Sequence, residues 1–434
     1  MILSRYCKSY HSTEDSDSVV LYSTKKASSI LLPFSMLADI ESGNLIEEEK
    51  ETLEELGFLV KDHDTETTEV SGLIGELNTL NKTFHVKPVM NLDCNLACKY
   101  CFEGQRKGKF YMTQETADSF IHFVGERISA DLFEEVGITF YGGEPLLSLD
   151  LILYMSGKLK KLSESKGLRF SFSFITNGTL FTRKTVEKLI PLGLKSAAIT
   201  IDGPREIHDF FRPFKGGAGS FDAIFRNVKE VCGITDVQVG GNFTRESYKE
   251  YPLLLDIMLA SGLTPDKISQ VRFDPVMRER EGIASPGFHE GCVSLSEPWL
   301  FEAMVFLREE ILKRGFSSGK IMPSTCMMEY THSLVLNHDG SIYKCPGFID
   351  RPEFKVGDLR KGIEDYKHSH NLESWKNEEC LECAYLPLCF GGCRYMKFIR
   401  DGNMKGVDCR KPYYDATLEA FVKQDIKYGL CKRG

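Results

Sequence analysis

The 434-residue sequence lacks the features that would direct a protein into or across a membrane. No apolar run approaches the roughly 18 residues that a membrane helix needs, and the amino-terminal residues lack the apolar segment of a secretory signal. An excess of basic charge is also missing, because 54 Lys and Arg stand against 62 Asp and Glu, a net charge of −8. We therefore expect a cytoplasmic protein that binds neither membranes nor nucleic acids.

Disorder and fibrous repeats are excluded by the composition, which is 42% hydrophobic and 27% charged, as in ordinary globular proteins. The unusual feature is cysteine, with 14 residues, eight of them between positions 326 and 434. In a reducing cytosol, clustered cysteines indicate metal ligands or catalytic thiols before disulfides.

The chain divides into three predicted regions, 1–84, 85–290 and 291–434. In the first, strand patterns at 18–23 and 29–32 precede amphipathic segments at 34–40, 47–56 and 71–80, which is typical of a small winged-helix-like module. The last region has little apolar periodicity after a helix predicted at 298–313. We expect metal to organise its cysteine-rich part, because metal binding can supply folding free energy.

The middle region alternates between strands and helices, which predicts an α/β fold with a parallel sheet, either doubly wound or curled into a barrel. Strands are predicted at 85–92, 137–141, 169–176, 196–201, 237–243 and 270–273, and helices at 113–128, 149–165, 183–192, 221–231 and 249–260. Polar and glycine-rich residues follow the strands. They are Cys94, Gly142 to Pro145, Thr176 to Gly178, Thr200 to Gly203, Asn242 and Asp274. In a β/α barrel, catalytic residues gather at these carboxyl ends.

Three cysteines follow the first of these strands in a C-x3-C-x2-C pattern, Cys94, Cys98 and Cys101. Three thiolates in one tight loop can hold three irons of a four-iron cluster. The fourth iron is then open to a substrate or cosubstrate, as in catalytic metal sites. The alternative is three idle or buried thiols.

With Tyr100 before its last cysteine, this motif resembles that of the radical S-adenosylmethionine (SAM) superfamily. Gly142-Gly143-Glu144-Pro145, Thr176-Asn177-Gly178 and Ile201-Asp202-Gly203-Pro204 with Arg212 are similar to the later motifs of that superfamily, in the same order. The resemblance implies a partial (β/α)6 TIM-like barrel. It also implies a catalytic [4Fe-4S] cluster on Cys94, Cys98 and Cys101 whose open iron binds SAM. One electron from the cluster then cleaves SAM to a 5′-deoxyadenosyl radical, which takes a hydrogen atom from the substrate.

The same resemblance implies which residues contact SAM. Tyr100, Gly143 and Glu144 match positions at the cosubstrate, and Thr200 and Arg212 match positions near its ribose and carboxylate. Phe273 matches a position near the adenine. For Arg212 the alternative is a surface arginine, and for Phe273 it is barrel core.

The cysteine-rich tail resembles the SPASM extension of peptide-modifying radical enzymes, which carries two auxiliary [4Fe-4S] clusters and so makes three in total. By that resemblance Cys380, Cys383, Cys389 and Cys409 hold the outer cluster. Cys326, Cys345 and Cys393 hold the inner one, and its fourth ligand is either Cys292 or a thiolate of the substrate. Spacing alone also allows zinc. Cys7, Cys232 and Cys431 are expected to be spare thiols.

Sulfatase maturases resemble the chain in outline, but they carry an aspartate where this sequence has Pro346 after Cys345. The motifs around Cys94, Gly240 and Cys383 are closest to geopeptide-type radical maturases, which act on cysteine-rich precursor peptides. The first region then resembles a precursor-recognition module of the RiPP type, and the last is the SPASM domain. A merely structural amino-terminal cap remains the alternative.

The leading hypothesis is an oxidoreductase that forms thioether crosslinks in a cysteine-containing precursor peptide. A flavodoxin- or ferredoxin-type protein would be its low-potential electron donor. The alternatives are formylglycine-type sulfatase maturation or carbon–carbon crosslinking, and a non-catalytic iron–sulfur or zinc protein that binds peptides. The sequence leaves open the peptide, the acceptor carbon and the oligomeric state.

Overall fold

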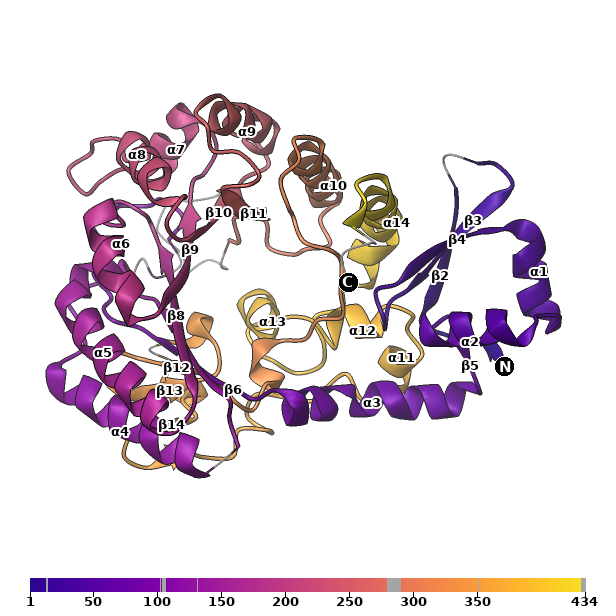
Figure 1. Cartoon of the computed structure of the whole chain (residues 1–434), viewed down its shortest axis with the longest axis horizontal. Helices are drawn as coiled ribbons and strands as arrows, with labels where there is room; N and C mark the ends of the chain where they lie inside the picture. Colours follow the sequence, from indigo (N-terminus) through magenta and orange to yellow (C-terminus); the bar gives the residue numbers. More distant parts are fainter. Residues whose placement is uncertain are drawn as a thin grey trace. The chain divides into compact units, whose positions relative to one another are not determined.

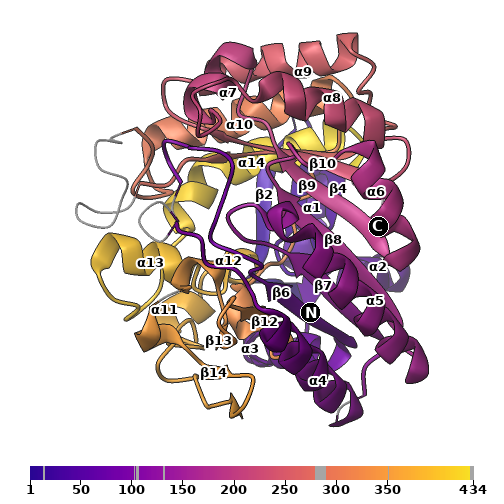
Figure 2. The same ribbon diagram turned by 90° about the vertical axis from the view of Figure 1, so that its left-hand side faces the viewer.

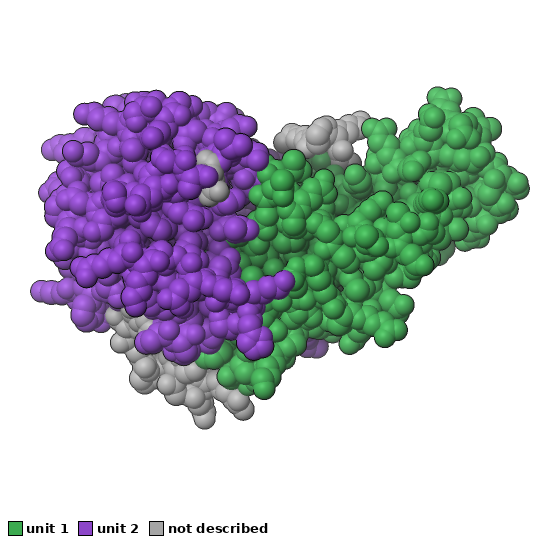
Figure 3. All heavy atoms as spheres, turned by 90° about the horizontal axis from the view of Figure 1, so that it is seen from below, with its two compact units in different colours: residues 1–80, 319–330, 371–434 green, residues 81–318, 331–370 purple. Residues whose placement is uncertain are grey.

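The computed structural model describes residues 1–12, 15–101, 103, 107–130, 132–278, 290–349 and 351–430 (Figure 1). Cys431 lies outside these residues. The chain forms two compact units, which Figure 3 colours separately. Unit 1 comprises residues 1–80, 319–330 and 371–434, and unit 2 comprises residues 81–318 and 331–370.

Six parallel strands form the centre of unit 2 and follow one another in chain order across the sheet. They are β6 (Thr83–Pro88), β7 (Glu135–Phe140), β8 (Arg169–Thr176), β9 (Leu194–Thr200), β10 (Asp236–Phe243) and β11 (Ile268–Pro275). Beyond β6 the sheet continues through β12 (Ser333–Leu336), β13 (Ser341–Tyr343), β14 (Gly357–Asp358) and β15 (Gly362–Ile363). Because β11 pairs only with β10 in the described sheet, the six strands form an open, partial barrel. The predicted fold class is confirmed.

Helices cover the outer face of these strands, as Figures 1 and 2 show for α4, α5, α6 and α8. The helices of unit 2 are α4 (Gln114–Ala130), α5 (Leu149–Ser165), α6 (Arg183–Leu189), α7 (Arg205–Phe211), α8 (Phe221–Val231), α9 (Tyr251–Ala260) and α10 (Pro298–Lys313). The ends of α4, α5, α6, α8, α9 and α10 lie within a few residues of the predicted ones, because the apolar period of each helix matches a face that must be buried. Helix α7 has no counterpart among the predicted helices, since its seven residues are too few to show an apolar period.

Strand β8 shows how the sequence assigns the two faces of the sheet. Its residues alternate between phenylalanine and serine, and Phe172 and Phe174 join the hydrophobic core that also contains the α5 side chains. On the other face, the Ser173 hydroxyl lies 3.1 Å from Thr139 Oγ1, which is 3.0 Å from His85 Nε2. The outer face is therefore apolar and the inner face is polar.

Unit 1 combines the two ends of the chain. Strands β2 (Cys7–His11), β3 (Ser18–Ser23) and β4 (Ser29–Pro33) form an antiparallel sheet, and β1 (Ile2–Leu3) pairs with β5 (Leu59–Val60). The amino-terminal helices are α1 (Phe34–Ser42), α2 (Glu47–Glu55) and α3 (His63–Leu80). The carboxyl-terminal helices are α11 (Glu378–Leu381), α12 (Leu386–Cys389), α13 (Arg394–Asp401) and α14 (Lys411–Lys427).

The composition of unit 1 differs from the predicted regions 1–84 and 291–434. Two hydrophobic clusters join these segments, one around Tyr6 and Trp375 and one around Tyr22 and Leu418. Hydrogen bonds add to this shared core, since the Tyr6 hydroxyl donates to Leu381 O at 2.8 Å. The amino-terminal elements therefore complete a core that the cysteine-rich tail does not form alone. Among the described residues, no helix combines the length and apolar character needed to cross a membrane.

Candidate functional site

The three cysteines of the C-x3-C-x2-C motif line one cavity of unit 2, which has a volume of about 200 Å³. The loop that carries them follows β6 and is anchored by backbone hydrogen bonds, Ala97 N to Pro213 O at 2.8 Å and Lys99 N to Phe211 O at 3.0 Å. Burial raises the pKa of the Cys94 thiol to about 11 and also raises that of Cys101. Iron bound here would favour the thiolates instead.

The glycine turn after β7 forms the floor of this cavity. Gly143 N donates to Asn91 O at 3.0 Å, and Glu144 N donates to Asp93 O at 2.8 Å. A Cβ at Gly143 would lie 2.3 Å from Asp93 O. Only glycine therefore allows the turn to approach the backbone that leads into Cys94, which leaves the turn exposed to a ligand.

Glu144 does not line the cavity and lies fully buried beneath it. Its carboxylate accepts hydrogen bonds from Leu146 N (3.1 Å), Thr176 Oγ1 (2.8 Å) and Asn177 N (2.8 Å). These hydrogen bonds connect the end of β7 to the end of β8. Glu144 therefore orients the two strand ends.

Tyr100 and Arg212 line the cavity together, within a network of buried polar groups. Arg212 Nη1 donates to the Tyr100 hydroxyl at 2.8 Å, and that hydroxyl donates to Asp202. Asn242 closes the network, because its backbone N donates to Asp202 Oδ1 at 2.7 Å and its side chain donates to the Tyr100 hydroxyl at 3.1 Å. Burial raises the pKa of Asp202, while the Arg212 charge opposes this.

Of the residues expected to contact SAM, Tyr100, Gly143, Thr200 and Arg212 line the cavity. Phe273 does not; it is buried in the core with its ring 4.7 Å from that of Tyr251. Arg212 is buried and is therefore not the surface arginine of the alternative interpretation.

Other residues of the cavity were not assigned a role from the sequence. Asn242 lies at the carboxyl end of β10, a position that the sequence marks as polar, whereas no sequence motif includes Glu103, Lys107 or Tyr141. Glu103 and Lys107 lie in a loop without apolar periodicity. Only the folded loop reveals that both reach the cavity.

The thiols assigned to the outer auxiliary cluster all belong to unit 1. Burial is the main cause of the raised pKa of Cys380, and Cys383 and Cys409 raise it further. Burial likewise raises the pKa of Cys389 to about 12, with added repulsion from Cys383 and Cys380. The thiols of this set therefore act on one another electrostatically.

The thiols assigned to the inner cluster are divided between the units. Cys326 and Cys393 belong to unit 1, and Cys345 belongs to unit 2. Burial is the main cause of the raised pKa of Cys393, and the Cys326 thiol raises it further. Cys292 is fully buried in the hydrophobic core of unit 2, with its Sγ 3.1 Å from Met277 Sδ. Within the described residues, no three His, Cys, Asp or Glu side chains are placed to hold a metal ion. A four-iron cluster does not require its ligands to surround one metal ion, since each of its thiolates binds a separate iron.

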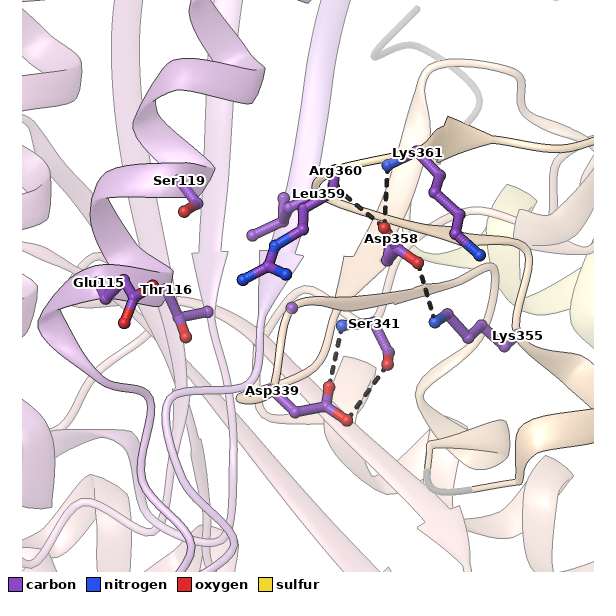
Figure 4. A pocket seen from close by; sticks show the side chains of 11 residues that line it. Glu115, Thr116, Ser119, Asp339, Ser341, Lys355, Asp358, Leu359, Arg360 and Lys361 are labelled. Atoms are coloured by element: carbon purple, nitrogen blue, oxygen red, sulfur yellow. Dashed lines mark hydrogen bonds and ion pairs between the residues drawn. The ribbon is translucent and has the colours of Figure 1, made fainter.

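A larger cavity of about 500 Å³ lies elsewhere on unit 2, between α4 and the turns that precede β13 and β15 (Figure 4). Three of its charged groups, Asp339, Lys355 and Asp358, have partners within the cavity lining. Lys355 Nζ lies 3.1 Å from Asp358 Oδ2, and Asp339 accepts from Ser341 N at 2.9 Å. None of the residues assigned from the sequence lines it, so we place the functional site at the cysteine cavity.

Comparison with known proteins finds a family match over the part of the chain that contains the residues lining this cavity. The model of the radical SAM superfamily matches residues 90–245, so this part of the chain is a radical SAM domain. The serine-type anaerobic sulfatase-maturating enzyme of Bacteroides thetaiotaomicron is 28% identical over 394 residues, which are 79% of this chain and 91% of that enzyme.

Two solved structures share the fold. The structure of anSMEcpe with bound AdoMet superposes with a TM-score of 0.61 at 19% identity, over 81% of this chain and 100% of that one. Streptococcus suis SuiB bound to its precursor peptide SuiA superposes with a TM-score of 0.55 at 15% identity, over 94% of this chain and 98% of that one. The predicted resemblance to radical SAM maturases is confirmed.

Proposed function

We propose that this protein is a radical SAM enzyme that oxidises a side chain of a peptide or protein substrate. The observation that carries the proposal is the cysteine cavity. Three thiols, a ligand-accessible glycine turn and the side chains of Thr200 and Arg212 meet there at the carboxyl ends of parallel strands.

The residues present fit a four-iron cluster and SAM. Cys94, Cys98 and Cys101 supply three thiolates, which leaves one iron for the amino and carboxylate groups of SAM. Arg212 offers a positive charge to that carboxylate, and Thr200 offers a hydroxyl to the ribose. When bound, SAM and the reduced cluster supply the 5′-deoxyadenosyl radical. The chain's own groups then orient the cosubstrate and exclude water around it.

The substrate class follows from the relatives. The sulfatase-maturating relative is matched over nearly its whole length, and SuiB was solved with a precursor peptide. These comparisons favour sulfatase-type oxidation, the alternative hypothesis, over thioether formation. In that reaction the side-chain carbon of a serine or cysteine loses a hydrogen atom to the adenosyl radical. The remaining radical gives one electron to an iron–sulfur cluster and one proton to a base, and an aldehyde or thioaldehyde results.

Pro346 supports thioether formation as the second candidate. It follows Cys345 at the start of a short 3-10 helix and offers no group to accept the proton that sulfatase-type oxidation releases. Thioether formation also removes one hydrogen atom from carbon, one proton from a thiol and one electron, while a carbon–sulfur bond forms. An open iron of the inner cluster that binds the substrate thiol would hold its sulfur as a thiolate, with the proton already removed. The buried position of Cys292 supports such an open iron.

The auxiliary clusters and the electron donor belong to the proposal. Cys380, Cys383, Cys389 and Cys409 would hold the outer cluster, and Cys326, Cys345 and Cys393 would hold the inner one. Three clusters in total would receive electrons from a flavodoxin- or ferredoxin-type protein.

Strand β4 is the proposed docking edge for the substrate peptide. Within the part of the chain that the structure describes, it pairs with β3 alone, and Leu31 on it is 48% exposed. An extended peptide can add to such an edge through backbone hydrogen bonds.

The test is anaerobic reconstitution of the full chain, followed by incubation with dithionite, SAM and peptides that contain serine and cysteine. We expect 5′-deoxyadenosine from the wild type and none from Cys98→Ala, with Cys232→Ala as the matched control. A product that reacts with a hydrazine probe indicates an aldehyde, and a crosslinked product without free thiol indicates a thioether. An enzyme that contains the cluster but cleaves no SAM would refute the proposal.

A further inference from the structure

Lys107 lies in the same cavity as the three cysteines, although it is six residues beyond the last of them. Its ammonium group forms a hydrogen bond with the Cys101 thiol. Burial has the largest influence on the pKa of the Cys101 thiol and raises it. The charge of Lys107 has the second largest influence and lowers that pKa. Lys107 therefore interacts directly with one cluster ligand.

The second cation of the cavity is placed differently. Arg212 is buried against Asp202, with 3.8 Å between Nη1 and Oδ2, and it donates to the Tyr100 hydroxyl. The Cys98 thiol and the Asp202 carboxylate both raise the pKa of Arg212 against the effect of burial, so its charge is shared between a cysteine and that carboxylate. Glu103 is the acidic residue among the described lining residues, and it forms a hydrogen bond with the Tyr141 phenol. Among the described lining residues, the cation bonded to a thiol is Lys107.

We propose that Lys107 is a positioning residue that raises the reduction potential of the radical SAM cluster, by a hydrogen bond to the Cys101 sulfur and by its positive charge. The inference rests on the proposed function only in requiring a four-iron cluster on Cys94, Cys98 and Cys101. The potential of such a cluster depends on its net charge, on hydrogen bonds to its sulfurs and on solvent exposure. A nearby cation favours the reduced state because that state carries one more electron.

Glu103 opposes this effect, since its carboxylate lies in the same cavity. Its hydrogen bond to Tyr141 directs the carboxylate toward β7, whereas Lys107 bonds to the ligand itself. The two residues make opposite predictions, because removal of the carboxylate should raise the potential and removal of the ammonium should lower it.

The experiment is a redox titration of the reconstituted full-length enzyme, followed by electron paramagnetic resonance, without SAM and without peptide. The signal of the radical SAM cluster is the one that Cys98→Ala removes. At a fixed potential, Lys107→Met should lower the ratio of reduced to oxidised cluster about tenfold, equivalent to about 59 mV for one electron. Lys107→Arg should restore most of the ratio, and Glu103→Gln should raise it.

Lys109→Met is the matched control, because Lys109 lies two residues away and is exposed. An unchanged midpoint in Lys107→Met with full iron content would overturn the proposal, as would an equal loss in Lys107→Arg. If Lys107→Met fails to retain the cluster, Lys107→Gln replaces it in the test, because glutamine keeps a hydrogen-bond donor without the charge. A ratio of reduced to oxidised cluster equal to that of the wild type would then overturn the proposal. Absence of any signal that depends on Cys98 in the wild type would instead refute the cluster, and with it the proposed function.

Discussion

A buried ion pair between the cysteine segments of unit 1 provides a sharp test of how that unit is stabilised. Arg394, next to Cys393, donates to the Glu329 carboxylate, three residues after Cys326, and both side chains are 3% exposed. Glu329 also accepts a hydrogen bond from Glu373 N at 3.2 Å. We expect Glu329→Ala to destabilise unit 1 strongly, because it leaves a buried guanidinium without its counter-charge.

The expected magnitude is about 3–5 kcal/mol, the usual cost of removing one partner of a buried pair. With a urea m-value of about 2 kcal/mol/M, the unfolding midpoint falls by roughly 2 M. Replacing both partners, as Glu329→Leu with Arg394→Met, should recover much of the loss. About 1–3 kcal/mol should remain lost, because Glu373 N then loses the Glu329 carboxylate that accepts its hydrogen bond.

The chain's two tryptophans allow this test to report on one unit. Trp375 is fully buried in unit 1, and Trp299 lies on α10 of unit 2. In a Trp299→Phe background, fluorescence during anaerobic urea titration follows unit 1 alone. Glu419→Ala is the control, since its pair with Lys423 is exposed and such pairs contribute only about 0.3–0.5 kcal/mol. A Glu329→Ala midpoint as close to wild type as that of Glu419→Ala would refute the reasoning.

Three further predictions concern unit 2. Gly143→Ala should abolish SAM binding in equilibrium dialysis, because its Cβ meets Asp93 O at 2.3 Å, whereas Gly157→Ala, with open space around it, should bind normally. Burial lowers the pKa of His208 to about 3, so its folded state stays neutral while the unfolded chain gains a proton below about pH 6.5. Unit 2 should therefore lose up to about 1.4 kcal/mol per pH unit as the pH falls from 6.5 toward 3, measured as the urea midpoint of Trp299 fluorescence; a flat profile contradicts this. Cys292→Ala should leave the iron content unchanged, and loss of one cluster would assign Cys292 as a ligand.

The sequence predicts the barrel of unit 2 well because its signals are local. Helix α5 and helix α8 begin and end at the predicted residues, and the strands agree within a few positions. The short strand β2 was missed, since Cys7–His11 has a mixed burial pattern with no clear apolar alternation. It is defined by its pairing with β3, which the sequence of β2 alone does not encode.

Within the site, the same distinction separates what sequence motifs predict from what only folding reveals. Tyr100, Gly143 and Arg212 occupy motif positions and do line the cavity. Glu144 belongs to the same motif, yet its carboxylate is directed at the backbone of the next strand. A motif marks which residues a site needs, but it does not separate those that touch a ligand from those that hold the site together.

Unit 1 shows how segments from two of the predicted regions come to share one core. The tail between residues 371 and 430 contains the short helices α11, α12 and α13 before the 17-residue α14, and its buried aromatic side chains pack against partners from the amino-terminal segment. Trp375 lies in one cluster with Tyr6, Val70 and Ile74, more than 300 residues earlier in the chain. Apolar periodicity reports which face of an element is buried but not which distant element covers it. The amino-terminal segment must therefore fold with the cysteine-rich tail, and a peptide that docks on the β4 edge would bind the unit that holds Cys380, Cys383 and Cys389. Removal of residues 1–80 should consequently lower the iron content as well as peptide binding, whereas an independent recognition module would lose binding alone.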